Sequence, residues 1–133
     1  MSRKILLVED TIDALVNLRD LLKMEGFEVI TAENGSEAMY KFYLYTPDII
    51  MTDLRMPKMD GFALIERIKK SDELRDIPII VFSASATPEN ERKSLALGAD
   101  LFLKKPCPTE VLLKSIYRLL GDEAAGDSAH RDS

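Results

Sequence analysis

The chain has 133 residues, of which 46% are hydrophobic and 31% charged, a composition typical of one soluble globular domain. Its net charge of −5 argues against nucleic acid or an anionic membrane as the main partner, because both attract a positive excess. The single cysteine, Cys107, excludes an internal disulfide framework and a cysteine-based zinc cluster. No apolar stretch has the length of a membrane span or of a signal-peptide core, so we expect a cytoplasmic protein without membrane contact.

Five short apolar runs alternate with longer amphipathic stretches. The runs are nearly continuous in aliphatic residues, as in strands covered on both faces of a parallel sheet, and comprise Lys4–Val8, Phe27–Thr31, Asp48–Thr52, Ile77–Phe82 and Asp100–Lys104. Between and after them, apolar residues recur at helical spacing, for example at Ile12, Leu15, Leu18 and Leu22. Five strands alternating with five helices predict right-handed βα units and a three-layer α/β/α sandwich.

Glycine and proline mark several predicted helix ends. Gly26 and Gly98 follow helical stretches, where a left-handed C-cap is expected. Thr87-Pro88 indicates an N-cap with proline in the first turn, and Pro108 is interpreted as a second start of this kind.

The predicted domain covers residues 1–120. Residues 121–133 (GDEAAGDSAHRDS) have no apolar side chain larger than alanine and cannot bury enough surface to offset their ordering entropy. We interpret them as a disordered polar tail or the start of a linker. The only histidine, His130, falls in this tail, which excludes catalysis by a histidine in the core.

Polar side chains follow four of the five apolar runs. Glu9 and Asp10 follow the first, Asp53 the third, Ser83 the fourth and Lys105 the fifth. Each alone has a structural explanation as a helix cap, a turn residue or a solvated side chain. Ligand sites of open parallel sheets, however, lie beyond the carboxyl ends of the strands, where these residues would meet. Three carboxylates at one edge call for a cation, and oxygen ligands without His or Cys indicate Mg²⁺.

The sequence resembles the receiver domain of bacterial two-component response regulators over about residues 3–120. The motifs that carry this resemblance occur in order along the chain as Glu9-Asp10, the segment DLRMPKMDG from Asp53 to Gly61, Ser83-Ala84 and Lys105-Pro106. The resemblance implies a flavodoxin-like sheet of five parallel strands in the order 2-1-3-4-5.

The resemblance also implies roles for individual residues. Asp53 would be the phosphoacceptor, taking a phosphoryl group from a histidine kinase or a histidine phosphotransfer protein. Lys105 would pair with the phosphoryl oxygens, and Ser83 would move to hydrogen-bond one of them. Phe102 occupies the aromatic switch position, and Pro106 the position that usually follows a cis peptide bond.

For the metal, the resemblance implies that Mg²⁺ is held by Asp10, Asp53 and the backbone carbonyl of Arg55, with Glu9 acting through a water molecule. Glutamate stands where aspartate is commonest in the acidic pair, and Ser83 and Phe102 stand where threonine and tyrosine are common. These departures keep the acid, the hydroxyl and the aromatic ring, while Phe102 lacks the tyrosine hydroxyl.

The function expected from these residues is a phosphoryl-accepting signalling switch that catalyses only its own phosphorylation and dephosphorylation. Its output would be altered affinity for a downstream protein of unknown identity, without direct nucleic-acid binding, as a monomer or a phosphorylation-dependent dimer. The chain is also compatible with a receiver domain excised from a hybrid sensor kinase or another multidomain regulator.

Two other functions fit these residues less well. A magnesium-dependent phosphohydrolase would usually carry a second aspartate two residues after its nucleophile, where this chain has Arg55. A receiver-like module that is never phosphorylated would be expected to have lost an acid or the lysine, and none is lost here. The aromatic cluster Tyr40, Phe42, Tyr43 and Tyr45 is interpreted as helix surface and core packing, with partner contact as the alternative.

Overall fold

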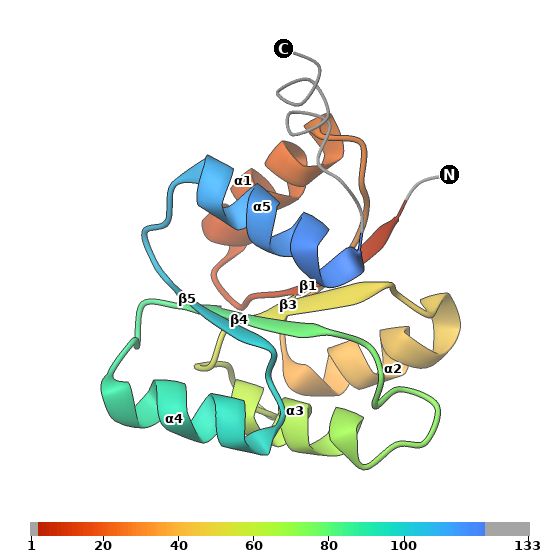
Figure 1. The fold of residues 1–133 in the computed structure, drawn as a ribbon. Coiled ribbons are helices and arrows are strands. Elements are labelled where there is room, and N and C mark those ends of the chain that lie inside the picture. Colours follow the sequence, from red (N-terminus) through yellow and green to blue (C-terminus); the bar gives the residue numbers. More distant parts are fainter. Residues whose placement is uncertain (1–2, 122–133) are drawn as a thin grey trace.

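The computed structural model describes residues 3–121, in which five strands alternate with five helices (Figure 1). The strands are β1 (Lys4–Val8), β2 (Glu28–Ala32), β3 (Ile49–Thr52), β4 (Ile79–Ser83) and β5 (Leu101–Lys104). The helices are α1 (Ile12–Met24), α2 (Gly35–Tyr45), α3 (Gly61–Lys69), α4 (Pro88–Leu97) and α5 (Thr109–Leu120). Apart from Gly121, the predicted tail lies outside the described residues.

All strands are parallel and lie in the order β2-β1-β3-β4-β5, which confirms the predicted sheet. Helices α1 and α5 cover one face of the sheet, while α2, α3 and α4 cover the other (Figure 1). The α/β/α sandwich is therefore confirmed. No helix within residues 3–121 is both long enough and apolar enough to cross a membrane.

The core consists of two apolar layers separated by the sheet. Side chains alternate across a strand, so Leu6 and Val8 pack with α2, α3 and α4, whereas Ile5 and Leu7 pack toward α1 and α5. The four side chains are at most 2% exposed. Burying one such side chain contributes roughly 1.5–3 kcal/mol. Coverage on both faces explains why the strands are continuous apolar runs rather than alternating ones.

Four of the five strands begin one or two residues later than the sequence suggested, β3 and β5 among them. Asp48 and Asp100 precede β3 and β5 rather than starting them, and each carboxylate accepts a hydrogen bond from the backbone of a neighbouring strand. Asp48 accepts from the Lys4 amide at 2.7 Å and Asp100 from the Ile79 amide at 2.8 Å. These aspartates therefore join the ends of adjacent strands.

The helix ends largely follow the predicted signals. Gly26 and Gly98 have positive φ angles of 98° and 124°, as a helix end of this kind requires. The Thr87 side chain accepts from the Asn90 amide at 3.1 Å at the start of α4, with a proline in the first turn. Pro108 differs from the prediction, because it occupies the N-cap position of α5 itself rather than its first turn.

Candidate functional site

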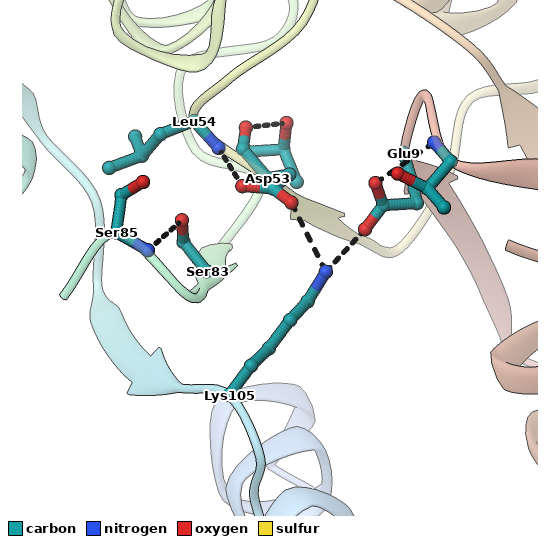
Figure 2. A network of polar contacts seen from close by, with 8 residues as sticks. Glu9, Asp53, Leu54, Ser83, Ser85 and Lys105 are labelled. Atoms are coloured by element: carbon teal, nitrogen blue, oxygen red, sulfur yellow. Dashed lines mark hydrogen bonds and ion pairs between the residues drawn. The ribbon is translucent and has the colours of Figure 1, made fainter. Parts of the chain in front are cut away.

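The sheet order brings the polar residues that follow separate strands to one edge. Glu9 follows β1, Asp53 follows β3, Ser83 ends β4 and Lys105 follows β5. Figure 2 shows the Lys105 side chain extending so that its amine lies between the Asp53 and Glu9 carboxylates. Residues separated by up to 96 positions in the sequence therefore form one polar centre.

Lys105 is the centre of this group. Its Nζ donates to Asp53 Oδ2 at 3.1 Å and to Glu9 Oε1, and its side chain is 24% exposed. The side chains of Glu9 and Asp53 are 7% and 14% exposed, so the two ion pairs are largely shielded from water. One ammonium thus pairs with two neighbouring carboxylates and offsets one of their two negative charges.

The remaining carboxylate oxygens are held by backbone amides. Glu9 Oε2 accepts from the Thr11 amide at 3.1 Å, and Asp53 Oδ1 accepts from the Leu54 amide at 2.6 Å. The Asp53 amide in turn donates to the carbonyl of Val8 at 3.1 Å, which ties the loop after β3 to the end of β1. The Asp53 carboxylate is therefore fixed by its own strand end and by Lys105.

The three charged groups shift one another's protonation. Burial acts to raise the pKa of Asp53, but the nearby Ser83 hydroxyl and Lys105 ammonium outweigh it, so this pKa lies below its ordinary value. Burial raises the pKa of Glu9, and Lys105 offsets this only in part. Burial acts to lower the pKa of Lys105, yet its bond to Glu9 and the charge of Asp53 raise it. At neutral pH Asp53 is therefore an anion beside a cation.

Asp10 and the Arg55 carbonyl, unlike Glu9 and Asp53, are not engaged by other described groups of the site. Asp10 is exposed, and within residues 3–121 neither its carboxylate nor the Arg55 carbonyl has a hydrogen-bond partner. Both are hard oxygen donors with free lone pairs, which suits Mg²⁺. In the described part of the chain no three Asp, Glu, His or Cys side chains form a metal-binding group, and Glu9 and Asp53 are each paired with Lys105.

The two residues assigned to the switch lie on neighbouring strands. Ser83 is buried at the end of β4, and its Oγ accepts from the Ser85 amide at 3.1 Å (Figure 2). Phe102 pairs with Val81 in the β4–β5 register and is partly buried against the core layer beneath α3 and α4. The Lys105-Pro106 peptide bond is cis, as the resemblance implied.

One feature of the site was not predicted. A hollow of about 510 Å³ opens beside Lys105, and its lining is mostly apolar, with side chains from α1, β4 and the loop after β5: Glu9, Ala14, Leu18, Phe82, Ala84, Lys105, Pro106 and Cys107. The Lys105 Nζ also lies 5.3 Å from the centroid of the Phe82 ring. The helical spacing of Leu18 can be seen in the sequence, but its position beside the charged centre cannot.

Comparison with known proteins agrees with this geometry. The sequence matches the response regulator receiver domain family over residues 5–117. It is 41% identical to a gliding motility regulatory protein of Myxococcus xanthus over 87% of this chain, and spans only 15% of that protein. It is 31% identical to the polar-differentiation response regulator DivK of Brucella anthropi, covering 92% of this chain and 99% of that one.

A solved structure shows the same fold. The receiver domain of the sensor histidine kinase PA1611 from Pseudomonas aeruginosa, with a magnesium ion coordinated in its active site cleft, is 27% identical with a TM-score of 0.85. The comparison covers 92% of this chain and all of that one. The fold and the charged centre at one edge of the sheet thus define a flavodoxin-like signalling domain. The chain belongs to the response regulator receiver domain family, whose members are signalling switches rather than conventional enzymes.

Proposed function

We propose that this domain is a phosphoryl-accepting switch and that Asp53 is the phosphoacceptor. An Asp53 carboxylate oxygen attacks the phosphorus of a phosphohistidine on a histidine kinase or a histidine phosphotransfer protein. The new O–P bond forms as the P–N bond breaks, and the imidazole leaves with the electron pair of that bond. The observation that carries the proposal is the ionised, positioned Asp53 carboxylate, with the Lys105 ammonium 3.1 Å away.

Positioning and charge neutralisation are the main requirements of phosphoryl transfer. Lys105 supports both, because an ammonium on a flexible stem can leave a carboxylate and follow the incoming phosphoryl oxygens. In the described structure it holds Glu9 and Asp53 together, so its release toward the phosphoryl group also frees Glu9.

Mg²⁺ fits the remaining donors of the site. Asp10, Asp53 and the Arg55 carbonyl would hold the ion directly and Glu9 through water, and all four are hard oxygen donors. The ion would supply positive charge to the phosphoryl oxygens. Asp10 and the Arg55 carbonyl have no competing partner among residues 3–121, whereas Glu9 is engaged by Lys105 and by the Thr11 amide.

The switch follows from the position of Ser83. Its hydroxyl accepts from the Ser85 amide and lies beside Asp53, so a small rotation would bring it to a phosphoryl oxygen (Figure 2). Phe102 on the adjacent strand is only partly buried and can repack when the β4 end moves. This is a shift between packed states that alters the face offered to a downstream protein.

This chemistry is compatible with a free-standing regulator and also with a domain of a longer protein. The Myxococcus relative is far longer than the chain, while the Brucella relative has about its length. The apolar hollow beside Lys105 offers either form a surface on which the phosphodonor can rest next to Asp53.

A phosphotransfer screen tests the proposal. Each histidine kinase of the source organism is loaded with labelled phosphate and mixed with the chain in the presence of Mg²⁺. We expect label to pass to the wild type and to Asp76→Asn, a control at an exposed acid away from the site, but not to Asp53→Asn. Transfer to Asp53→Asn at the wild-type rate, or transfer from no kinase, would contradict it.

A further inference from the structure

Helix α2 has two apolar stripes, although only one is buried. The buried stripe of Gly35, Ala38 and Phe42 faces the sheet. Tyr40, Tyr43 and Leu44 form a second stripe at i, i+3 and i+4 and are 66%, 57% and 56% exposed. With Tyr45 they account for four of the eight exposed large hydrophobic side chains in the described part of the chain. Exposed apolar side chains gathered on one helix, rather than scattered singly, are typical of interaction surfaces.

The second stripe borders a hollow of about 420 Å³ between α2 and α3. We define the α2–α3 face by the residues that line this hollow: Met39, Tyr40, Tyr43, Arg67, Lys70 and Ser71. A partly buried methionine and two tyrosines provide the apolar part, and Arg67 of α3 with Lys70 at the C-cap of that helix provides a cationic rim. Tyrosine and arginine are among the residue types that contribute most to binding at protein interfaces.

The charge of this face is opposite to that of the chain. Within residues 3–121, Arg67 has no carboxylate partner. Lys70 pairs with Glu66 at 3.7 Å, but both side chains are more than half exposed, so the pair is weak. Charges more than about 10 Å from a docked segment are largely screened, so the two cations of the rim act on it more strongly at contact than the net charge of −5 does.

We propose that the α2–α3 face docks a partner-protein segment that carries acidic residues next to large apolar ones. Carboxylates of the segment would pair with Arg67 and Lys70, while its apolar side chains would cover Met39, Tyr40 and Tyr43. The tyrosine rings can bury their faces and keep their hydroxyls in water, which suits a partly polar segment.

This docking is independent of the phosphoryl group. Helix α3 begins at Gly61, whose amide bonds the Leu54 carbonyl beside Asp53 at 2.9 Å. Arg67 lies six residues further on, about 9 Å along the helix axis at its rise per residue, and Lys70 caps the end of the helix. The face therefore sits at the far end of α3 from the acceptor. It would hold a partner in both states of the switch, and the inference does not rest on Asp53 being phosphorylated.

The test selects random twelve-residue peptides displayed on phage against the whole chain. The selected peptides are then synthesised and titrated into the ¹⁵N-labelled protein. We expect peptides that combine Asp or Glu with Leu, Phe or Trp, and amide shifts concentrated in α2 and α3. Tyr43→Ala and Arg67→Glu should each weaken binding about tenfold or more, a factor that corresponds to roughly 1.4 kcal/mol.

Matched controls separate the face from general surface effects. Tyr45→Ala and Arg92→Glu alter the same residue types at exposed positions that do not line the hollow, and should leave affinity unchanged. Beryllofluoride with Mg²⁺ should also leave it unchanged, as should Asp53→Asn.

The proposal is overturned if no selected peptide loses affinity in Tyr43→Ala and Arg67→Glu, or if the peptides lack acidic residues. Self-association that Tyr43→Ala abolishes, measured by sedimentation, would identify a second copy as the occupant and would also overturn it. Affinity that changes with beryllofluoride would refute its independence from phosphorylation. All four substituted side chains are exposed, so unfolding of the variants, checked by circular dichroism, does not mask the result.

Discussion

Gly61 at the start of α3 sets the distance between that helix and the Asp53 loop. A Cβ atom at this position would lie 2.4 Å from the Asp53 carbonyl oxygen and 2.8 Å from the Leu54 Cα. Unbonded heavy atoms are best separated by roughly 3.5–4.0 Å, so a methyl group here overlaps two backbone atoms by about 1 Å. Neither atom can swing aside as a flexible side chain would. Gly61→Ala therefore forces α3 away from the end of β3.

The magnitude follows from two opposing effects. Overpacking at a rigid contact costs about 1–3 kcal/mol, and the severe overlap places this site at the upper end. Alanine recovers up to about 1 kcal/mol over glycine in a helix. We expect Gly61→Ala to lower the free energy of unfolding by about 2 kcal/mol. Because the displaced carbonyl belongs to Asp53 itself, we also expect slower formation of the acyl phosphate.

The assay combines urea unfolding with the initial rate of phosphorylation by acetyl phosphate and Mg²⁺. Gly26→Ala is the matched control: its φ of 98° makes alanine cost about 1 kcal/mol, yet a Cβ there meets no atom within 4 Å. It should lose stability and keep the wild-type rate. Wild-type stability and rate in Gly61→Ala would refute the reasoning, and equal loss of rate in both variants would show that general destabilisation is the cause.

Three further predictions concern the charged centre and the switch. Burial raises the pKa of Glu9 above its ordinary value of 4.5, so the folded state holds this proton more tightly than the unfolded state does. As pH rises above 4.5, the free energy of unfolding of the wild type should therefore fall relative to that of Glu9→Gln. Urea unfolding without metal should show a larger advantage of Glu9→Gln at neutral pH than below pH 4.5. Mg²⁺ should stabilise wild type by mass action, whereas Asp10→Asn should gain stability without metal and lose most of the Mg²⁺ effect; equal stabilisation of both would contradict the assignment. Beryllofluoride with Mg²⁺ should shift amide signals of residues 83–106 more than those of residues 12–25, and Ser83→Ala should reduce this difference; equal shifts in both segments would count against the switch.

The fold could be predicted because its signals are local in the sequence. A strand covered on both faces must be apolar throughout, so runs such as Lys4–Val8 predicted strands whose bounds the structure reproduces within about two residues. The convergence of Asp53 and Lys105 was also predictable, since both follow parallel strands and must lie at the same edge.

What could not be predicted depends on side-chain reach and on how helices pack. The ion pair between Glu9 and Lys105 requires a glutamate conformation that points to the lysine, which no spacing rule encodes. Asp48 and Asp100 appeared to be strand residues because nothing local reveals that they bond the backbone of another strand. Likewise, Tyr43 and Arg67 line one hollow only because α2 and α3 are neighbours on the sheet.

The central claim is that Asp53 is the residue that takes the phosphoryl group. The most direct measurement treats the chain with acetyl phosphate and Mg²⁺, reduces the acyl phosphate with borohydride, and locates the reduced residue by peptide mass spectrometry. We predict reduction at Asp53 alone, with no reduced residue when Asp53→Asn is treated in the same way. A reduced residue at Asp10, Glu9 or Asp60, or an unchanged yield in Asp53→Asn, would contradict the claim.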